Sequence, residues 1–252
     1  MTDVKGLNAL VTGGGRGIGA AIAAAMTRKG ARVTILGRTE TVLTAAVARG
    51  DAADYIVADV TDAHSFEKAM TGIAAAGAID ILVNNAGTAL SAPFLKTGTA
   101  DFQRMLDVHL LGPVIAMRAL LPGMVARKFG RIVNIASTAA LKGYPYTSAY
   151  AAAKHGLLGL TRAVAIEVAS TGVTVNAVCP GFTDTDMAEA SIQTIVAKTG
   201  RTVEAARAEL TRTNPMGRMI APEDVADAVC FLARRESGAI TGSAVTVAGG
   251  EV

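Results

Sequence analysis

A tyrosine and a lysine four positions apart are the residues of this chain best suited to acid–base chemistry. Three alanines separate Tyr150 from Lys154, and because alanine is the strongest helix former, the two side chains are expected on one helix face, about one turn apart. A phenol with a pKa near ~10 is a poor acid at neutral pH, but an adjacent ammonium group favours the phenolate and lowers that pKa. Ser137, at the end of an apolar segment, can hydrogen-bond a substrate oxygen. These three residues predict proton transfer at an oxygen atom.

Taken alone, a Tyr-x-x-x-Lys pair is equally compatible with an ordinary helix surface. The interpretation therefore depends on whether the rest of the chain builds a hydride-transfer cofactor site beside the pair.

A glycine-rich loop supplies such a site near the start of the chain. The apolar segment Leu7–Thr12 predicts a strand, and an alanine-rich helix ending near Lys29 follows the loop. Backbone N–H groups at the start of a helix bind anions, and glycines let the backbone approach a pyrophosphate closely. The cofactor-binding residues predicted in this loop are Gly13, Gly15, Arg16, Gly17, Ile18 and Gly19.

The end of the second predicted strand, Arg32–Leu36, bears on the choice of cofactor. An acidic residue there would hold the ribose hydroxyls of NAD, but the chain has Gly37 followed by Arg38. An arginine is suited to a 2′-phosphate, and Arg16 can reach the same group. We therefore expect NADP(H) to be preferred, with NAD(H) not excluded, although each arginine alone is also compatible with a solvated surface charge.

Strands and helices alternate along the remaining chain. Further strands are predicted at Tyr55–Ala58, Ile79–Val83, Ile132–Ala136, Val173–Val178 and Ala244–Val247. Helices are predicted from Asp62, over Asp101–Arg127 with a break near Gly112-Pro113, from Tyr150, and over Pro222–Arg235. This pattern is typical of an α/β fold with a doubly wound parallel sheet of about seven strands and helices on both faces. Every polar motif falls at the C-terminal end of a strand, where such sheets bind ligands.

The chain resembles the short-chain dehydrogenase/reductase family over its full length. The residues that carry the resemblance are Thr12-Gly13-x3-Gly17-x-Gly19, Asn84-Asn85-Ala86-Gly87, Ser137, Tyr150-x3-Lys154 and Pro180-Gly181. It implies a single Rossmann-type domain over residues 1–252, a nicotinamide cofactor and hydride exchange with a carbonyl or alcohol. Within the family, Val173–Met187 is similar to the 3-oxoacyl and polyketide ketoreductases.

The resemblance also implies roles for individual positions. Tyr150 would be the general acid, Lys154 would lower its pKa and hold the nicotinamide ribose, and Ser137 would polarise the carbonyl. Further cofactor contacts are implied for Asp59 and Val60 at the adenine, for Asn85, Ala86 and Gly87 on the adenosine side, and for Pro180, Gly181, Thr183 and Thr185 at the carboxamide and pyrophosphate.

The chain departs from the family at one catalytic position. Where many members have an asparagine that holds a relay water, this chain has His109. Beside Lys154 a second positive charge is disfavoured, so we expect a neutral imidazole that either continues a proton relay or only packs near Gly112-Pro113.

The stretch from Met187 to Thr213 lies where the family has a substrate lid. Its basic residues are interpreted either as the solvated face of lid helices or as a site for a phosphate-bearing acyl carrier; they are Lys198, Arg201, Arg207 and Arg212. The predicted substrate pocket contains Ser137, Phe94, Tyr144 and Phe182, with Tyr146 nearby. In a chain with 4% aromatic residues, this favours a bulky apolar or aromatic substrate or, equally, core packing.

Composition excludes several other classes of protein. The net charge of +3 is small and the basic residues are scattered, which argues against nucleic acid as a partner. No uncharged apolar run reaches membrane length and no leader sequence is recognised, so a cytoplasmic protein is expected. The 2 cysteines and 3 histidines show no metal-binding spacing. The family resemblance, together with apolar helix faces around Leu106–Leu121 and Leu157–Val168, implies a homotetramer.

Three functions remain open from the sequence. The first is an NADP(H)-dependent ketoreductase or secondary-alcohol dehydrogenase acting on a 3-oxoacyl thioester or a bulky ketone. The second is an NAD-dependent catabolic dehydrogenase for a secondary alcohol or hydroxyacyl substrate. The third is a catalytically silent nucleotide-binding regulator on the same fold; the presence of Ser137, Tyr150 and Lys154 argues against it.

Overall fold

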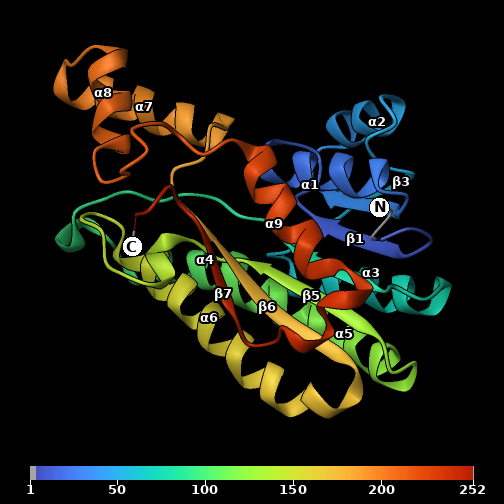
Figure 1. The fold of residues 1–252 in the computed structure, drawn as a ribbon. Coiled ribbons are helices and arrows are strands. Elements are labelled where there is room, and N and C mark those ends of the chain that lie inside the picture. Colours follow the sequence, from blue (N-terminus) through green and yellow to red (C-terminus); the bar gives the residue numbers. More distant parts are fainter. Residues whose placement is uncertain (1–3, 252) are drawn as a thin grey trace.

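Seven parallel strands form one sheet in the order β3-β2-β1-β4-β5-β6-β7 (Figure 1). The computed structural model describes residues 4–251, so residues 1–3 and 252 of the predicted domain lie outside it. The strands are β1 (Asn8–Thr12), β2 (Arg32–Gly37), β3 (Asp54–Val57), β4 (Ile81–Asn84), β5 (Gly130–Ile135), β6 (Val173–Pro180) and β7 (Ala244–Val247). The predicted doubly wound parallel sheet is confirmed.

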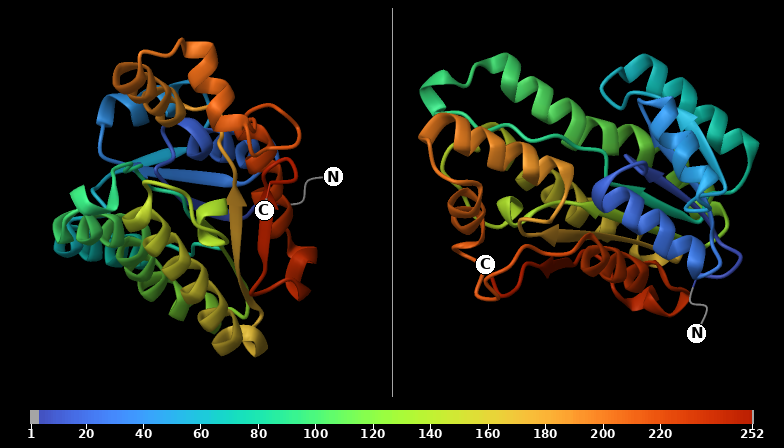
Figure 2. Two further views of the ribbon diagram at one scale, coloured as in Figure 1. Left: turned by 90° about the vertical axis from the view of Figure 1, so that its left-hand side faces the viewer. Right: turned by 90° about the horizontal axis from the view of Figure 1, so that it is seen from above.

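Helices connect the strands and cover both faces of the sheet. They are α1 (Gly17–Arg28), α2 (Glu40–Ala48), α3 (Ala63–Ala76), α4 (Thr99–Leu106), α5 (Gly112–Ala126), α6 (Ser148–Val168), α7 (Asp186–Thr199), α8 (Val203–Thr211) and α9 (Pro222–Ala233). Figure 1 shows α1, α2 and α9 above the sheet and α3 to α6 below it. In Figure 2, α7 and α8 stand beyond the strand ends, where the lid was expected.

Successive side chains of each strand point alternately to the two faces of the sheet, so the apolar core consists of two parts, one under each helix layer. In β1, Ala9 and Val11 pack in the cluster that includes α1 and α9, whereas Leu10 packs in the cluster that includes α3 and α5. Because successive side chains point to opposite faces, a strand covered on both sides must be apolar throughout. This explains why the strands read as continuous apolar runs.

The strand order reverses between β1 and β4, which pair in parallel although β2 and β3 lie between them in the chain. At such a point the connections leave β1 and β4 on opposite sides and open a crevice at their C-terminal ends. The glycine loop follows β1 and the Asn84–Gly87 segment follows β4. The crevice therefore lies between two of the predicted cofactor motifs.

A chain of buried polar side chains ties this part of the sheet to α6. The Asn84 amide donates to Asn134 Oδ1 (2.8 Å), and the Asn134 amide donates to the Thr161 hydroxyl (2.9 Å). Thr161 in turn donates to the Leu157 carbonyl one turn earlier in α6 (2.7 Å). Satisfied buried hydrogen bonds fix orientation because leaving any member unpaired is costly. They therefore fix the position of the helix that carries Tyr150.

Several predicted boundaries shift by one or two residues, and two features differ in kind. Helix α2 has no counterpart among the predicted elements. The break predicted at Gly112-Pro113 is instead a π-helical segment, Asp107–Leu111, which joins α4 to α5. Pro113 lies in the first turn of α5, where its missing N–H costs no helical hydrogen bond. Wide turns of this kind often occur at functional sites, and His109 lies within this one.

The helical stretch Thr99–Ala126 is long and apolar enough to cross a membrane by length and composition. Val108, Ala116, Leu120 and Met124 along it are buried in the core below the sheet. We therefore interpret the stretch as a core helix.

Candidate active site

Close backbone packing makes the glycine loop a cradle that side chains would fill. Gly13 has a φ of +65°, and a Cβ there would lie 2.9 Å from the Ala86 Cα. A Cβ on Gly19 would lie 2.2 Å from the Gly13 carbonyl oxygen. Asn85 fixes this arrangement, because its amide donates to the carbonyls of Thr12 (2.9 Å) and Gly13 (3.2 Å). Asn85 therefore supports the cradle with its side chain.

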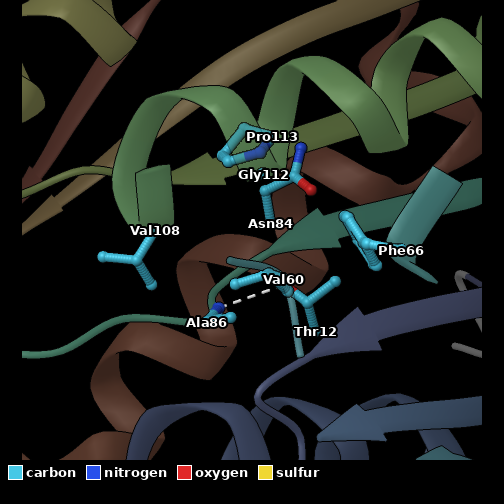
Figure 3. A pocket seen from close by; sticks show the side chains of 8 residues that line it. All are labelled: Thr12, Val60, Phe66, Asn84, Ala86, Val108, Gly112 and Pro113. Atoms are coloured by element: carbon cyan, nitrogen blue, oxygen red, sulfur yellow. Dashed lines mark hydrogen bonds between the residues drawn. The ribbon is translucent and has the colours of Figure 1, made fainter. Parts of the chain in front are cut away.

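Thr12 joins the two motifs from the other side. Its hydroxyl accepts hydrogen bonds from the backbone N–H groups of Asn85 and Ala86, each at 3.0 Å, and the second is drawn in Figure 3. The same figure shows the residues that line a small gap, among them Thr12, Asn84, Val108 and Pro113. The gap has no room for a water molecule, so it is part of the packing beneath the crevice.

The N-terminus of α1 is free to bind an anion. Its first residues have no side-chain cap and its first turn has no acidic residue, so the dipole and the N–H groups there are unneutralised. A Cβ on Gly17 would lie 3.2 Å from Thr185 Cγ2, which places Thr185 beside the loop. The glycine cradle, this helix end and the adjacent threonine fit a dinucleotide pyrophosphate.

At the ends of β2 and β3, the predicted 2′-phosphate and adenine residues lie next to each other. Arg38 Nη1 is 3.9 Å from Asp59 Oδ2, and the Arg38 side chain is 74% exposed. A contact this long and exposed restrains the guanidinium only weakly, so the group remains available. Arg16 is exposed at the start of α1. The Val60 side chain is buried in the lower core, which leaves its backbone for any adenine contact.

Ser137 and Tyr150 form the open part of the predicted catalytic group. Ser137 ends β5 with extended backbone, and its hydroxyl accepts from the Ala139 N–H at 3.1 Å. Both side chains are partly exposed. Burial raises the pKa of Tyr150, while a hydrogen bond from the Ser137 side chain acts in the opposite direction. The two hydroxyls therefore lie together, on residues that are only partly exposed.

Lys154 lies behind them. Its ammonium donates to the Ile135 carbonyl at 2.7 Å and lies 5.6 Å from the centre of the Tyr150 ring. Burial lowers the pKa of Lys154 to about 7. Burial also holds the pKa of Tyr150 above its usual value in this arrangement, and the lowering expected from Lys154 stays a prediction.

His109 faces the catalytic group. Its ring meets the Tyr150 ring edge to face at 5.1 Å between centroids, and a Cβ on Gly87 would lie 2.8 Å from its Cε1. Nε2 is 2.8 Å from the Thr88 carbonyl and so carries the proton, while Nδ1 is buried without a partner among residues 4–251. Burial first and the charge of Lys154 second hold the pKa of His109 well below its usual value. The expected neutral state is thus supported, and the ring turns toward Tyr150.

The segment after β6 forms another wall of the site. Gly181 packs against Ala248, since a Cβ on it would lie 3.3 Å from the Ala248 Cα. The Thr183 hydroxyl donates to the Gly181 carbonyl at 3.0 Å, and Thr183 pairs with Ile220 in an isolated bridge. Pro180 is the last residue of β6. The segment between β6 and α7 is therefore fixed by its contacts with Ala248 and with Ile220.

The predicted pocket aromatics divide into two groups. Tyr144 and Phe182 contact each other edge to face at 6.4 Å between centroids. Phe94 is 67% exposed in a separate short turn. The segment just before that turn is joined to the loop that contains Tyr144, because the Ala92 N–H donates to the Tyr146 carbonyl at 2.9 Å.

The basic residues of the lid are largely engaged with lid carboxylates. Arg207 forms ion pairs with Asp184 and Glu189, each at 3.2 Å, and both Arg201 and Arg212 pair with Glu209. These pairs join α8 to α7 and to the segment after β6. This arrangement favours the interpretation of a solvated helix face.

Glu251 is a site residue that the sequence interpretation missed. It is 3% exposed, and its carboxylate accepts a hydrogen bond from the predicted substrate residue Tyr144 at 2.8 Å. No motif marks it, since its partners lie far away along the chain.

Comparisons with known proteins agree with this geometry. A model of the short chain dehydrogenase family matches residues 7–196. A 3-oxoacyl-[acyl-carrier-protein] reductase of Rickettsia bellii is 36% identical over 250 residues, covering 99% of this chain and 98% of that protein. A 2-(S)-hydroxypropyl-CoM dehydrogenase of Xanthobacter autotrophicus is 39% identical over 246 residues, covering 95% of this chain and 94% of that protein. Among solved structures, a variant actinorhodin polyketide ketoreductase with NADPH superposes with a TM-score of 0.91 at 33% identity, covering 99% of this chain and 98% of that one.

Proposed function

The chain belongs to the short-chain dehydrogenase family, and on that premise we propose that it is an NADP(H)-dependent ketoreductase with Tyr150 as the proton donor. The substrate class is a 3-oxoacyl thioester or a bulky apolar ketone. The observation that carries the proposal is the pairing of the hydroxyls of two partly exposed residues, Ser137 and Tyr150, with two buried nitrogen groups, those of Lys154 and His109.

The state of Tyr150 supports reduction. Because burial raises its pKa, the phenol keeps its proton at neutral pH and can give it to a carbonyl oxygen that gains negative charge. The nicotinamide, when bound, supplies the hydride to the carbonyl carbon. Ser137 orients the carbonyl with its hydroxyl. Oxidation of an alcohol would need the phenolate instead, which the same burial disfavours.

His109 is proposed to help order the hydrogen-bonded chain through which solvent returns a proton to Tyr150, without giving up a proton itself. With Nε2–H donating to the Thr88 carbonyl, Nδ1 remains as an acceptor for a hydrogen-bonded chain from Lys154 toward solvent. A neutral imidazole accepts such a bond without placing a second positive charge beside Lys154.

NADP(H) binding is proposed from the residues that face the crevice and from a structural relative whose name includes NADPH. The glycine cradle and the N-terminus of α1 fit the pyrophosphate, and Arg38 and Arg16 are proposed to contact the 2′-phosphate. A charge-assisted contact contributes about 1.5–3 kcal/mol, roughly a ten- to hundredfold preference per arginine. The relative named as a dehydrogenase makes an NAD-dependent alcohol dehydrogenase the second candidate.

A bulky apolar substrate is proposed from the rim of the site. Phe94, Leu95 and Tyr146 are exposed, at 67%, 96% and 63%, on two segments that a backbone hydrogen bond joins. Exposed apolar side chains gathered at a catalytic opening are typical of apolar ligand sites.

The test is a screen of 3-oxoacyl thioesters and aromatic ketones with NADPH and with NADH, following reduced-cofactor absorbance. We expect ketone reduction with NADPH, and a kcat about 10²- to 10⁴-fold lower in Tyr150→Phe, the range that general acid catalysis contributes. Cofactor binding should be retained in that variant, because only a hydroxyl is removed. Arg38→Ser should lower kcat/KM with NADPH and leave the value with NADH nearly unchanged.

Near-normal turnover of Tyr150→Phe would contradict the assigned proton donor. Faster turnover of an alcohol with NAD than of any ketone with NADPH would favour the second candidate.

A further inference from the structure

Glu251 places a buried carboxylate at the centre of a polar cluster next to the site. Its Oε1 accepts from the hydroxyls of Tyr144 (2.8 Å) and Thr213 (2.5 Å) and lies 3.3 Å from the ammonium of Lys142. Burial alone would raise the pKa of Glu251, but hydrogen bonds from these three side chains outweigh it, and the pKa lies below its usual value. A buried charge held in this way is ionised and fixed in place.

The partners of this carboxylate belong to different walls of the candidate active site. Lys142 and Tyr144 lie in the loop between Ser137 and Tyr150, and Thr213 follows lid helix α8. The Tyr144 hydroxyl also lies 2.7 Å from the hydroxyl of Thr138, the residue after Ser137.

A third wall lies within reach of the same group. A Cβ on Gly181 would lie 3.6 Å from the second oxygen of the Glu251 carboxylate. One carboxyl group therefore touches the catalytic loop, the base of the lid and the wall after β6.

The backbone around Glu251 is fixed against the base of the lid as well. Gly249 has a φ of +63°, and a Cβ on it would lie 2.2 Å from Asn214 Oδ1. The Met216 N–H donates to the Gly249 carbonyl at 3.3 Å. Asn214 directly follows Thr213, and Met216 lies two residues further on. The segments 249–251 and 213–216 therefore pack against each other as one unit.

We propose that Glu251 is a positioning residue that couples the lid to the loop between Ser137 and Tyr150. Its carboxylate keeps Thr213, at the base of the lid, at a fixed distance from Tyr144 in the loop between Ser137 and Tyr150. That distance determines how tightly the ketone binds. The inference rests on the proposed ketoreductase function for its kinetic consequence but not for its structural one. It predicts an effect on the KM of the ketone that exceeds the effect on kcat, because the groups that transfer the proton are untouched.

The kinetic test compares Glu251→Ala with Tyr144→Phe, Thr213→Val and wild type. Glu251→Ala should raise the KM of the ketone by about tenfold, the equivalent of one lost charge-assisted hydrogen bond, with kcat within about threefold. Glu251→Gln, which keeps the acceptor oxygen, should restore part of the loss. Tyr144→Phe combined with Glu251→Ala should cost less than the two single effects together, because both remove the same bond. Glu223→Ala, an exposed carboxylate on α9, is the matched control and should leave KM unchanged.

A second readout needs no turnover. Trypsin cleaves after the exposed lid residues Lys198 and Arg201, so cleavage rates in native protein report how firmly the lid is held. Glu251→Ala and Thr213→Val should both be cut faster there than wild type and the Glu223→Ala control.

The outcomes separate the two proposals. An unchanged cleavage rate, or additive kinetic effects of Glu251→Ala and Tyr144→Phe, would overturn the coupling. A lower melting temperature with unchanged KM would show that Glu251 only anchors the chain. Faster lid cleavage in a protein that reduces no ketone would leave the coupling standing and refute the ketoreductase function.

Discussion

At the scale of single residues, the candidate site combines the hydroxyls of two partly exposed residues with buried nitrogen groups whose pKa values are shifted. Burial lowers the pKa of Lys154 to about 7 and holds that of His109 well below its usual value. Both groups therefore favour their neutral forms more than free side chains do. With His109 neutral, the charge of Lys154 is at most a single one behind Tyr150, and burial keeps the phenol protonated until a substrate oxygen takes its proton.

The shift of Lys154 predicts a pH-dependent stability. Between pH 7 and 10 the unfolded chain binds more protons at this lysine than the folded protein, because the folded pKa is about 7 against 10.5 for the free side chain. The free energy of unfolding of wild type should therefore rise with pH in this window, relative to Lys154→Met. Urea unfolding of both proteins at several pH values checks this. A difference in the free energy of unfolding that stays constant with pH would show that the pKa of Lys154 is not lowered in the folded protein.

His109 gives a second prediction at this scale. His109→Asn should keep most of the activity, since an amide also offers a donor and an acceptor, whereas His109→Leu should slow proton delivery. The comparison is kcat against pH, with a solvent isotope effect on each variant. A leucine variant that is as stable as wild type, with an unchanged profile and isotope effect, would show that the ring only packs.

At the scale of elements, the site depends on how β4, β5 and α6 are joined. Asn134 links Asn84 and Thr161 in a place where water does not reach, so the position of α6 is set by hydrogen bonds as well as by apolar packing. The linked residues Asn134 and Thr161 thus lie on β5 and α6, the same two elements that position Ser137 and Tyr150.

Removing that link should destabilise the protein. Asn134→Leu leaves polar groups on Asn84 and Thr161 unpaired, at a cost of roughly 2–4 kcal/mol in the free energy of unfolding. Thr174→Val is the matched control, because the Thr174 hydroxyl is buried without a partner among the described residues, and its loss should be neutral or stabilising. Chemical denaturation measures both. Equal effects of the two substitutions would contradict the role of the link.

The sequence predicts the strand-end motifs well because each is local. The glycine loop, Ser137 and the pair Tyr150 and Lys154 are each recognised within a few residues, and the parallel sheet then gathers them at one edge. Glu251 could not be found in this way, since it contacts Tyr144 at a separation of 107 positions. The π-helical turn at His109 and the raised pKa of Tyr150 depend on packing and burial, which spacing does not reveal.

At the scale of the whole molecule, apolar side chains remain on the outside of the lower helix layer. Ile166 on α6 is 80% exposed and Leu111, before α5, is 43% exposed. The helix faces around Leu106–Leu121 and Leu157–Val168 were predicted to pair in a homotetramer. Such an arrangement would pair like faces about two-fold axes.

We predict a tetramer in solution that a charge on this face disrupts. Ile166→Glu should reduce the particle mass in light scattering at micromolar concentration, because a carboxylate buried between copies would be unpaired. Glu167→Gln, a neighbouring exposed residue, should leave the mass unchanged. A monomer mass for wild type would refute the prediction.

The long-range contacts of Glu251 also bear on how the protein forms during synthesis. The cradle that joins Gly13 to Asn85 needs only the first third of the chain, although α9 must later cover α1. The lid base and the catalytic loop meet their common carboxylate only after residue 251 has been added. Since chains are made at about 5–20 residues per second, the pieces of the nucleotide cradle precede Glu251 by several seconds on the ribosome. Until then the loop between Ser137 and Tyr150 lacks its anchor, and a nascent chain in this interval is exposed to proteases and chaperones at its future substrate opening.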